Sequence, residues 1–523
     1  MRKRKLWGWG YEGEGIEPAE RKALSAALKA RFPDHEPQDA RPPRPEDLKV
    51  PEPRVSLPSA LEHLGSSEPV ERAIHAYGKS YRDLVRSLQG SFPHPPDVVA
   101  QPRSESDVTA LLEWCSDEEV AAIPYGGGTS VVGGVEPDVG DSYSGTISID
   151  LRRLDRILEV DSVSGLARIQ AGTLGPSLEE QLEPHGLTLR HYPQSFEHST
   201  LGGWIATRSA GHHATLRTHV DDVVASVRVV TPAGVVETRR LPASGAGPAP
   251  ERLFIGSEGT LGIVTEAWMR VRERPRFKES AAATFKSFEE GAAAASALAR
   301  SELYPATCRL LDEREALLAG AGDGLRSVLL IGFESHDHAL GPWLERAVEL
   351  CSDHGGETAE RRSESSAEAW RRAFLRAPHL RDEMVRMGFT VETFETGVTW
   401  SALAPLLESV REGVEGVAPG ALLMVRLTHV YPDGAAPYFT VIAPARPGAE
   451  VERWDEIKAA ASDAILAGGG TITHHHAVGR DHRRWYDQEQ PEPYAVALRA
   501  AKRALDPYWT LNPGVLLDVP GGS

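Results

Sequence analysis

The glycine-rich stretch Pro124-Tyr125-Gly126-Gly127-Gly128-Thr129-Ser130, followed by Gly133-Gly134, decides how the rest of this chain is interpreted. It comes directly after the apolar run 120–123, which predicts a short strand. Glycine lets the backbone approach an anion closely, and successive free amides in such a turn form a concave anion site. Thr129 and Ser130 add hydroxyl donors. On its own the stretch predicts either a pyrophosphate cradle or an ordinary surface loop.

The composition indicates a large soluble protein that does not bind nucleic acid. A chain of 523 residues is too long for one small core, so we expect about two or three domains. The hydrophobic fraction of 41% and the charged fraction of 25% are typical of soluble globular proteins, and no run is long enough to span a membrane. The net charge of −18 argues against general nucleic-acid binding.

The cysteines and the start of the chain bear on its compartment. Cys115, Cys308 and Cys351 are widely separated, which argues for a reducing compartment and against a disulfide framework or a structural zinc site. The basic start, residues 1–5, is followed by Trp7-Gly8-Trp9-Gly10-Tyr11 and not by an apolar signal core. We therefore expect a cytoplasmic protein, whose basic start is either a solvated tail or a contact with anionic lipid. Peripheral membrane contact and a homodimer both stay open at this stage.

The order of elements predicts an α+β protein in four parts. Residues 1–95 form an N-terminal arm, 96–275 a first domain, 276–450 a second α+β domain, and 451–523 a helical segment with a histidine motif. The arm should hold helices at 18–32 and 69–87 and a proline-rich linker at 35–58. Strands are expected at 98–100, 120–124, 146–151, 167–171, 223–231, 235–238, 281–285, 309–311 and 328–333. Helices are expected at 108–115, 174–185, 292–299, 451–467 and 493–504.

Further turns rich in glycine, serine and threonine follow the first loop. They occupy 193–195, 199–203, 207–211 and 256–264. Hairpin turns of an α+β domain account easily for one such segment and poorly for all of them. The clusters therefore point to one composite binding site.

In this order and spacing, the turn clusters resemble the FAD-binding domain of the vanillyl-alcohol-oxidase-type flavoproteins. The ending 506–514 resembles the terminal signature of the same family. The resemblance covers the chain from Val98 onward and implies a two-part FAD-binding domain, a substrate (cap) domain and a C-terminal helical segment. It implies FAD contacts from Pro124, Gly126, Gly127, Gly128, Thr129, Ser130, His191, Pro193, Ser195, Ser199, Thr200, Gly202, Gly203, Thr207, Ser209, Gly211, Glu258, Gly259, Thr260, Gly262, Ile263 and Val264. Some relatives attach the flavin through a histidine in the first loop; since this loop has none, we expect non-covalent FAD.

Two branches of the family compete for this chain. FAD-dependent 2-hydroxy-acid dehydrogenases carry a metal motif that begins Glu-His-Gly, where this chain has His474-His475-His476. A second dehydrogenase motif, rich in Gly-Asp-Gly-Asn, corresponds here to 429–439, which lacks the Gly-Asn element and contains Tyr438. Both departures resemble the ether-lipid branch of the family. Further matches to that branch are 7–11, 306–312, 380–382 and 392–396.

The resemblance to the ether-lipid branch implies an FAD-dependent alkyl transfer. The acyl group of acyl-dihydroxyacetone phosphate is exchanged for a long-chain fatty alcohol, with oxidised FAD trapping the three-carbon phosphate through its N5 atom. It implies that Arg381 binds the phosphate and that Arg309 lies near the flavin and the headgroup; a structural ion pair is the alternative for each. Tyr438 would act as a base if nearby cations lowered its pKa.

The histidine triplet has a separate geometric prediction. On an extended segment adjacent side chains alternate, so His474 and His476 should face one way and His475 the other. Such a triplet cannot form a three-histidine metal site on one face, although a His-x-His pair could bind a metal. We expect no metal, and we assign the triplet catalytic and phosphate-contacting roles with neutral imidazole as the base. An FAD-linked dehydrogenase or oxidase of a 2-hydroxy acid or alcohol, and a flavin-binding protein without activity, are the alternatives.

Overall fold

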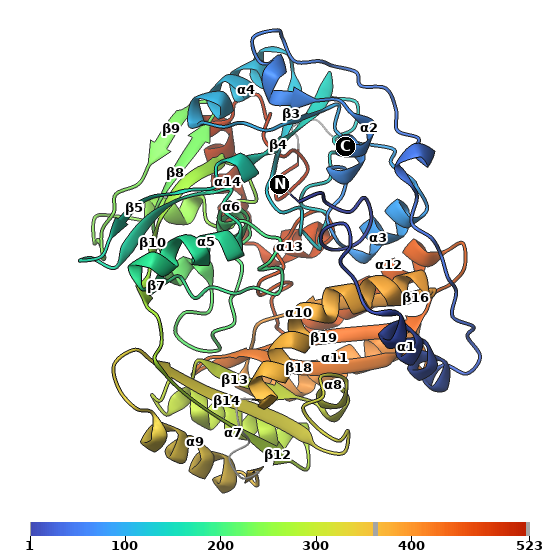
Figure 1. The fold of residues 1–523 in the computed structure, drawn as a ribbon, viewed down its shortest axis with the longest axis vertical. Coiled ribbons are helices and arrows are strands. Elements are labelled where there is room, and N and C mark those ends of the chain that lie inside the picture. Colours follow the sequence, from blue (N-terminus) through green and yellow to red (C-terminus); the bar gives the residue numbers. More distant parts are fainter. Residues whose placement is uncertain (1, 359–364, 519–523) are drawn as a thin grey trace.

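The chain forms two bodies, and its N-terminal arm passes over both. The structure is a computed structural model that describes residues 2–358 and 365–518. In Figure 1 the first domain, coloured blue to green, lies above the second domain, coloured yellow to orange. The first and second domains meet at the turns rich in glycine, serine and threonine, and the candidate site lies between the domains at this point.

The first sheet of the first domain carries the glycine loop. Its strand order is β1-β2-β4-β3, with β2, β4 and β3 parallel. The strands are β1 (Gly65–Ser66), β2 (Val98–Ala100), β4 (Gly145–Asp150) and β3 (Val120–Tyr125). The helix α4 (Glu105–Asp117) crosses from β2 to β3 and begins at a capping box of Ser104 and Asp107. β2, β3 and β4 confirm the predicted strands and α4 confirms the predicted helix cap, whereas β1 was not predicted.

The second sheet is antiparallel, with the order β5-β6-β10-β8-β9. Its strands are β5 (Ile157–Asp161), β6 (Leu166–Gln170), β10 (Ile263–Arg270), β8 (Val224–Thr231) and β9 (Gly234–Glu237). The helices beside it are α5 (Gly175–Leu182) and α6 (Leu201–Ala206). The sequence did not predict β5 or β10. The supposed turn at 199–203 is instead the first part of α6, which Thr200 caps by accepting from the Gly203 N–H.

The second domain is built on one eight-stranded sheet with the order β15-β12-β14-β13-β18-β19-β16, and β17 pairs with β19. Its strands are β12 (Phe277–Phe285), β13 (Thr307–Leu311), β14 (Ser327–Ser335), β15 (Glu357–Thr358), β16 (Phe389–Glu395), β17 (Val398–Thr399), β18 (Leu422–Val430) and β19 (Gly434–Pro444). A short pair, β7 (Leu187–Thr188) with β11 (Arg272–Glu273), lies at the junction of the two domains. All pairings in the large sheet are antiparallel, as expected for a sheet with two differently covered faces.

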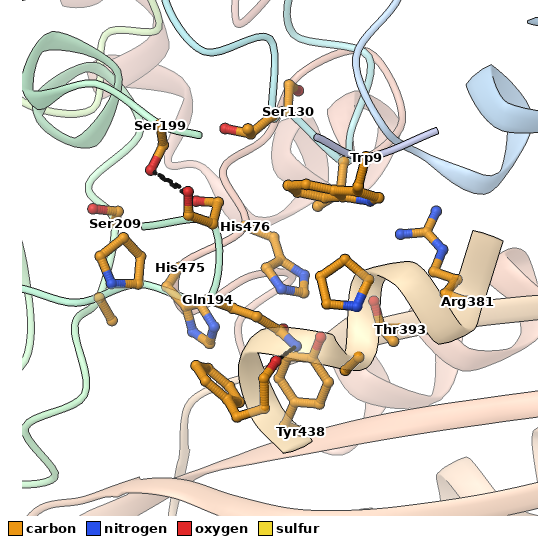
Figure 2. A pocket seen from close by; sticks show the side chains of 18 of the residues that line it. Trp9, Ser130, Gln194, Ser199, Ser209, Arg381, Thr393, Tyr438, His475 and His476 are labelled. Carbon is orange, nitrogen blue, oxygen red and sulfur yellow. Dashed lines mark hydrogen bonds between the residues drawn. The ribbon is translucent and has the colours of Figure 1, made fainter. Parts of the chain in front are cut away.

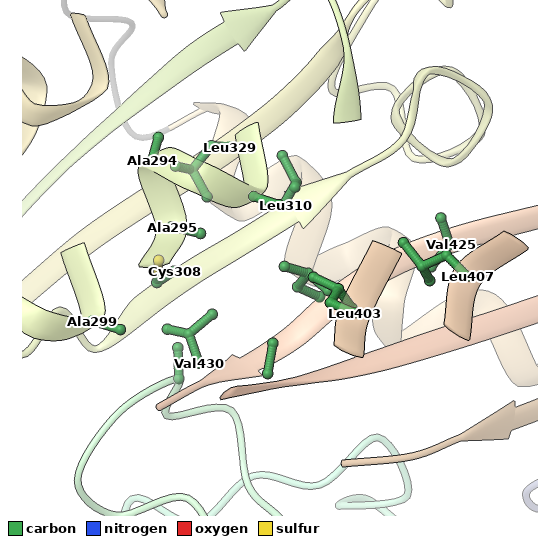
Figure 3. Close-up of a cluster of buried hydrophobic side chains, with 14 of the residues drawn as sticks. Ala294, Ala295, Ala299, Cys308, Leu310, Leu329, Leu403, Leu407, Val425 and Val430 are labelled. Carbon is green, nitrogen blue, oxygen red and sulfur yellow. The ribbon is translucent and has the colours of Figure 1, made fainter. Parts of the chain in front are cut away.

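Helices cover the two faces of the large sheet differently. One face packs against α7 (Phe288–Arg300), α9 (Gly341–Asp353), α11 (Trp400–Val417) and α12 (Glu450–Ala467), and forms the largest apolar core (Figure 3). The other face carries α8 (Glu313–Leu318) and α10 (Ser365–Arg386), and toward one end α1 (Pro18–Arg31). Because it is incompletely filled by side chains, this second face is available for a ligand.

The two ends of the chain tie the bodies together. Beyond α1, the arm contains two helices, α2 (Pro69–Ile74) and α3 (Tyr81–Leu88), where the sequence predicted one. After α12, the chain continues through α13 (Arg483–Glu489) and α14 (Glu492–Leu505) to Leu511, which bridges Ala122 of β3 in the first domain. Within the described residues, no helix combines the length and apolar character needed to cross a membrane.

Candidate active site

One cavity of about 870 Å³ lies between the first domain and the large sheet (Figure 2). Its walls come from the glycine loop, the later turn clusters, the sheet face under α10, and α1. It is lined by most of the predicted cofactor residues: Pro124, Gly126, Gly127, Gly128, Thr129, Ser130, Pro193, Ser195, Ser199, Thr200, Gly202, Gly203, Thr207, Ser209, Gly211, Glu258, Gly259, Gly262, Ile263 and Val264. Of the predicted catalytic and phosphate-binding residues, Arg309, Arg381, Tyr438, His475 and His476 also line it.

The glycine loop approaches the cavity with backbone alone. A Cβ atom on Gly127 would lie 2.0 Å from the carbonyl oxygen of His198. Gly128 has φ +65°, a conformation that side chains disfavour. Glycine is therefore required at both positions by close packing and by backbone conformation.

Two predicted cofactor residues lie behind the cavity wall and do not line it. The His191 ring packs 5.3 Å from that of Trp204, and its Nε2 lies 2.9 Å from Ser209 Oγ. Burial lowers the pKa of His191 to about 3, so the ring is neutral and holds Ser209 in the wall. Thr260 donates its hydroxyl to the Ser257 carbonyl at 2.7 Å and so closes the turn before β10. Neither residue lines the cavity and both side chains are used inside the fold, so a direct contact with the cofactor stays a prediction.

The floor of the cavity is one face of β16, β19 and β18, and its polarity changes along the strands. Cross-strand partners form rungs: first Glu395, Tyr438 and Arg426, then Thr393, Thr440 and Met424, then Val391, Ile442 and Leu422. All of these except Glu395 line the cavity, and Leu24, Ala27, Leu28 and Phe32 of the N-terminal arm close its apolar end. With a rise of about 3.4 Å per residue, roughly 14 Å separates Tyr438 from Ile442 along the strand. The cavity thus joins a polar end to an apolar channel.

Tyr438 sits at the polar end among cations and imidazoles. The Arg426 guanidinium lies 3.8 Å from the centre of its ring, and Thr393 makes a side-chain hydrogen bond to it. The rings of His475 and His476 lie 6.1 and 5.4 Å away. A cation is present as the sequence suggested, but burial raises the pKa of Tyr438 more than Arg426 lowers it. The expected lowering of its pKa is therefore wrong, and the phenol is protonated at neutral pH.

The histidine triplet wraps around one buried carboxylate. Glu395 accepts hydrogen bonds from the backbone N–H groups of His474 at 2.5 Å, His475 at 3.0 Å and His476 at 2.9 Å. It also accepts the Thr473 hydroxyl at 2.7 Å. Three consecutive amides can converge on one acceptor only in a turn, so the extended segment assumed from the sequence is not formed.

The turn reverses the predicted grouping of the histidines. His475 and His476 face the cavity beside Tyr438 (Figure 2), and His474 does not line it. His474 Nε2 instead lies 2.7 Å from the hydroxyl oxygen of Tyr431, and its ring packs 4.4 Å from that of His219. Burial is the main cause that holds the pKa values of all three histidines below the usual range, so their rings are neutral.

The histidines that have metal-ligand spacing in the structure are not the His474 and His476 pair that the sequence left open. It combines His429 with His474 and His475, whose ring nitrogens lie within 4.8 Å of one another. His429 Nε2 already lies 3.0 Å from the carbonyl oxygen of Gly211, so this ring is oriented by the backbone. Arg309 lowers the pKa of both His429 and His475, which means that its positive charge also acts against a cation here. The absence of a metal stays a prediction.

The two predicted arginines occupy different parts of the cavity. Arg309, on β13, is 2% exposed and donates to the carbonyl of His212 at 2.9 Å; burial lowers its pKa to about 9. Arg381, on α10, donates to the carbonyl of Lys79 at 2.7 Å and lies near Trp9 (Figure 2). Arg381 forms no ion pair with any described residue, and its Nε is buried without a hydrogen-bond partner, so the ion-pair alternative does not apply to it. Its charge is available to an anionic ligand.

Comparison with known proteins identifies the family. Residues 96–239 match the FAD binding domain, and residues 274–516 match the C-terminal domain of FAD linked oxidases. The alkyldihydroxyacetonephosphate synthase of Trypanosoma brucei brucei is 32% identical over 476 residues, which cover 86% of this chain and 78% of the relative. That of Dictyostelium discoideum is 30% identical, with 88% and 79% covered. A solved alkyldihydroxyacetonephosphate synthase superimposes with a TM-score of 0.80 at 27% identity, covering 97% of this chain and 98% of the other.

This chain belongs to the alkyldihydroxyacetonephosphate synthase family. The synthase is an FAD enzyme of ether-lipid synthesis, as the histidine triplet and Tyr438 predicted. A p-cresol methylhydroxylase structure, with a TM-score of 0.69 and 13% identity, shares the fold alone. The Glycolate oxidase subunit GlcD of Bacillus subtilis is 27% identical, so the oxidase interpretation has weaker support. The predicted fold class, FAD-binding and cap domains of the vanillyl-alcohol-oxidase type, is confirmed.

The residues of the synthase fit FAD. The glycine loop offers bare backbone where a diphosphate must approach closely, and the turns at 193–211 continue the same wall toward Tyr438. Gln194 donates to the carbonyl of Phe374 at 3.0 Å, so the turn wall also contacts α10. The cavity therefore offers a continuous surface on which a dinucleotide can extend from the loop to the polar end.

Sequence reasoning missed several residues of this site. Arg426, Glu395 and Trp9 were not singled out, and His429 was quoted only as part of a motif. Arg426 and Glu395 belong to the site because of strand register, which a single sequence does not reveal. Trp9 reaches the cavity from the N-terminal arm, and the one available signal was the match of 7–11 to the ether-lipid branch.

Proposed function

We propose that this synthase exchanges the acyl group of acyl-dihydroxyacetone phosphate for a long-chain fatty alcohol, using non-covalently bound FAD. The observation that carries the proposal is the single cavity that joins Tyr438 and Arg381 at a polar end to an apolar channel ending at Leu28. An enzyme that oxidises a small hydroxy acid has no use for such a channel. The channel supports two aliphatic substrates that share one polar reaction centre.

Arg381 is proposed to bind the substrate phosphate. Its guanidinium lines the cavity and forms no ion pair with a described residue, and guanidinium forks match phosphate oxygens. Arg309 lines the same cavity, donates to the carbonyl of His212, and would orient the headgroup. Because both arginines and Tyr438 line one cavity, they support a substrate held with its reacting carbon near the phenol.

Proton transfer is proposed to run through Tyr438, His475 and His476. The imidazoles are neutral at physiological pH and can accept a proton from the substrate carbon or from the alcohol. The Tyr438 hydroxyl is protonated and can donate or relay a proton at the reacting carbon. FAD, when bound, supplies the electrophilic centre of the reaction. The apolar floor beyond Thr440 excludes water from the same space.

Non-covalent attachment of FAD is also part of the proposal. The glycine loop contains no histidine, and no histidine or cysteine of the first domain lines the cavity within the described residues. Acid precipitation of the purified protein should leave the yellow chromophore in the supernatant. Colour that stays with the precipitated chain would contradict this part of the proposal and leave the alkyl transfer intact.

We also propose a peripheral encounter with a membrane near the apolar end of the cavity. Leu317 and Leu318 line the cavity and are each 58% exposed, and Leu325 nearby is 80% exposed. Exposed apolar side chains at the mouth of an apolar channel are suited to substrates drawn from a lipid phase. Sedimentation with vesicles, compared between the wild type and Leu325→Ser, tests this contact.

The test of the reaction uses acyl-dihydroxyacetone phosphate with and without hexadecanol. Release of fatty acid, together with an ether product that requires the alcohol, is the expected result. The same preparation is mixed anaerobically with D-lactate and other 2-hydroxy acids while the flavin spectrum is recorded. Bleaching of the flavin by a hydroxy acid, without any ether product, would overturn the proposal in favour of a dehydrogenase.

A further inference from the structure

The basic N-terminal segment, residues 2–15, folds back onto the glycine loop. Arg4 and Tyr11 form an antiparallel bridge, and the Glu12 N–H donates to the Lys3 carbonyl at 2.9 Å. We call residues 2–15 the N-terminal hairpin. The sequence predicted a solvated tail or a lipid contact for the basic start. Arg2 and Lys3 are exposed, whereas the partly buried Arg4 packs against the glycine loop.

The hairpin and the start of α3 hold the glycine loop by its carbonyl groups. The Arg4 guanidinium donates to the carbonyl of Gly127 at 2.9 Å and to the hydroxyl of Tyr125 at 2.8 Å. The Lys79 N–H donates to the carbonyl of Ser130 at 2.5 Å. In a trans peptide the C=O and N–H groups point in opposite directions. Arg4 and the Lys79 N–H bind these carbonyl groups on the side of the loop away from the main cavity. The N–H groups of the residues that follow Gly127 and Ser130 therefore point toward the main cavity.

The outer side of the loop is positively charged. A small second cavity there shares Gly127 and Thr129 with the main cavity. Its charged lining residues are Arg4, Lys5, Lys79 and Arg152, of which Arg152 is already paired with Asp150 at 2.5 Å. Burial, followed by the charge of Arg4, lowers the pKa of Lys79 to about 8. Among the described residues Arg4 and Lys79 form no ion pair, and Nη1 of Arg4 is buried without a hydrogen-bond partner.

Among the described residues that line the main cavity, no cation belongs to the first domain. The positively charged side chains among its described lining residues are Arg31, Arg309, Arg314, Arg381 and Arg426, and all of them belong to α1 or the second domain. A diphosphate on the glycine loop would carry two negative charges into a partly buried site. Arg4 and Lys79 lie across the glycine loop from such a diphosphate and form no ion pair with a described residue, so their charges are available to balance it.

We propose that the N-terminal hairpin completes the cofactor site, with Arg4 and Lys79 as binding residues that balance the charge of the FAD diphosphate across the glycine loop. The inference rests on FAD as the cofactor and is independent of the reaction that the bound flavin serves.

The hairpin also reaches the phosphate-binding end of the site. The Trp9 N–H donates to Asp382 Oδ2 at 2.7 Å, and Asp382 follows Arg381 on α10. Gly8 has φ +79°, and a Cβ atom there would lie 2.4 Å from the same carboxylate oxygen. The hairpin thus contacts the cofactor loop through Arg4 and the second domain through Trp9. Binding of FAD should consequently order the contact beside Arg381.

The test measures FAD affinity in variants of the hairpin. Apoprotein is titrated with FAD while flavin fluorescence is followed, at several salt concentrations. Arg4→Gln should raise the Kd for FAD about tenfold or more and make it less dependent on salt, because one balancing charge is removed. Arg4→Lys keeps the charge and should stay close to the wild type. Lys79→Gln should resemble Arg4→Gln.

Arg2→Gln is the matched control in the same hairpin. Arg2 pairs with Glu14 and its side chain is 65% exposed, so its loss should leave the Kd unchanged. An unchanged Kd in both Arg4→Gln and Lys79→Gln would overturn the proposal. Equal weakening in Arg4→Lys and Arg4→Gln would also overturn it, because the role of Arg4 would then be one of shape and not of charge. Since none of these measurements uses turnover, failure here is distinguishable from failure of the proposed reaction.

Discussion

Replacing Glu395 with glutamine should destabilise the synthase and misplace the histidines of its active site. Glu395 accepts four hydrogen bonds, from three consecutive amides and the Thr473 hydroxyl. Oε1 accepts three of the four hydrogen bonds, and Oε2 accepts only the His474 N–H. A glutamine whose oxygen takes the Oε1 position therefore turns its NH₂ group toward the His474 N–H. Leaving that one buried donor without an acceptor costs about 1–3 kcal/mol. The rings of His475 and His476 would then lose their fixed direction toward Tyr438.

The pKa of Glu395 gives a second estimate of how much this carboxylate stabilises the folded protein. Burial raises the pKa of Glu395, but His476 and His474, followed by the hydrogen bonds from Thr473 and the His475 N–H, lower it from an ordinary 4.5 to about 2. At about 1.4 kcal/mol per pKa unit, this corresponds to roughly 3 kcal/mol of stability. Because the folded-state pKa is depressed, the contribution is fully present above 4.5 and is lost as the pH falls toward about 2. The difference between wild type and variant should shrink over that interval.

The assay is urea unfolding followed by tryptophan fluorescence at neutral pH and at several acidic pH values. Glu489→Gln is the control, since Glu489 accepts the Thr471 hydroxyl at 2.6 Å and the Ile472 N–H at 2.9 Å in the same loop but is exposed. Glu489→Gln should therefore lower the free energy of unfolding much less than Glu395→Gln does. Equal stability of Glu395→Gln and wild type at neutral pH, or a difference that persists unchanged below the folded-state pKa, would refute the reasoning.

Further predictions concern the reaction itself. Tyr438→Phe should lower ether formation at least about 100-fold while FAD stays bound, because the hydroxyl alone is removed; near-normal activity would exclude that hydroxyl from proton transfer. Arg381→Lys should raise the KM for the phosphate substrate about tenfold with less effect on kcat, and an unchanged KM would place the phosphate elsewhere. Ile442→Trp should lower kcat/KM about tenfold for a long-chain alcohol and leave a short-chain alcohol unaffected; equal losses for both would contradict the proposed channel.

The residues of the cofactor wall could be predicted because their chemistry is local. Glycines at 126–128 and hydroxyl residues at 199–200 are typical of turns in which the backbone approaches a ligand closely. Nearly all of them line the cavity, and the strand before the loop and the cap at Ser104 are where the sequence indicated. Local backbone rules indicated a composite binding site, and the resemblance to the flavoprotein family supplied FAD and the individual contact residues.

The catalytic end could not be predicted to the same depth because its geometry depends on distant partners. The alternation rule for the histidines assumed a strand, and it fails because Glu395, 79 residues before His474, gathers the amides into a turn. Arg426 and Tyr438 meet through the register of β18 and β19. Arg4 reaches a hydroxyl 121 residues away. Each of these contacts joins residues far apart in the sequence, so the residues next to them give no signal that predicts the contact.

His474 occupies the position that distinguishes this branch of the family, and it can influence the site through its charge but not by touching the ligand. His474 stands where the metal-dependent branch has glutamate, yet it does not line the cavity and packs against His219 and His429 instead. Replacing a carboxylate with a neutral imidazole removes a negative charge from a region that Arg309 already makes unfavourable for a cation. The same cationic environment favours an anionic substrate. Histidine at 474 is therefore consistent with an anionic substrate, and in the proposed mechanism Tyr438, His475 and His476 carry out proton transfer.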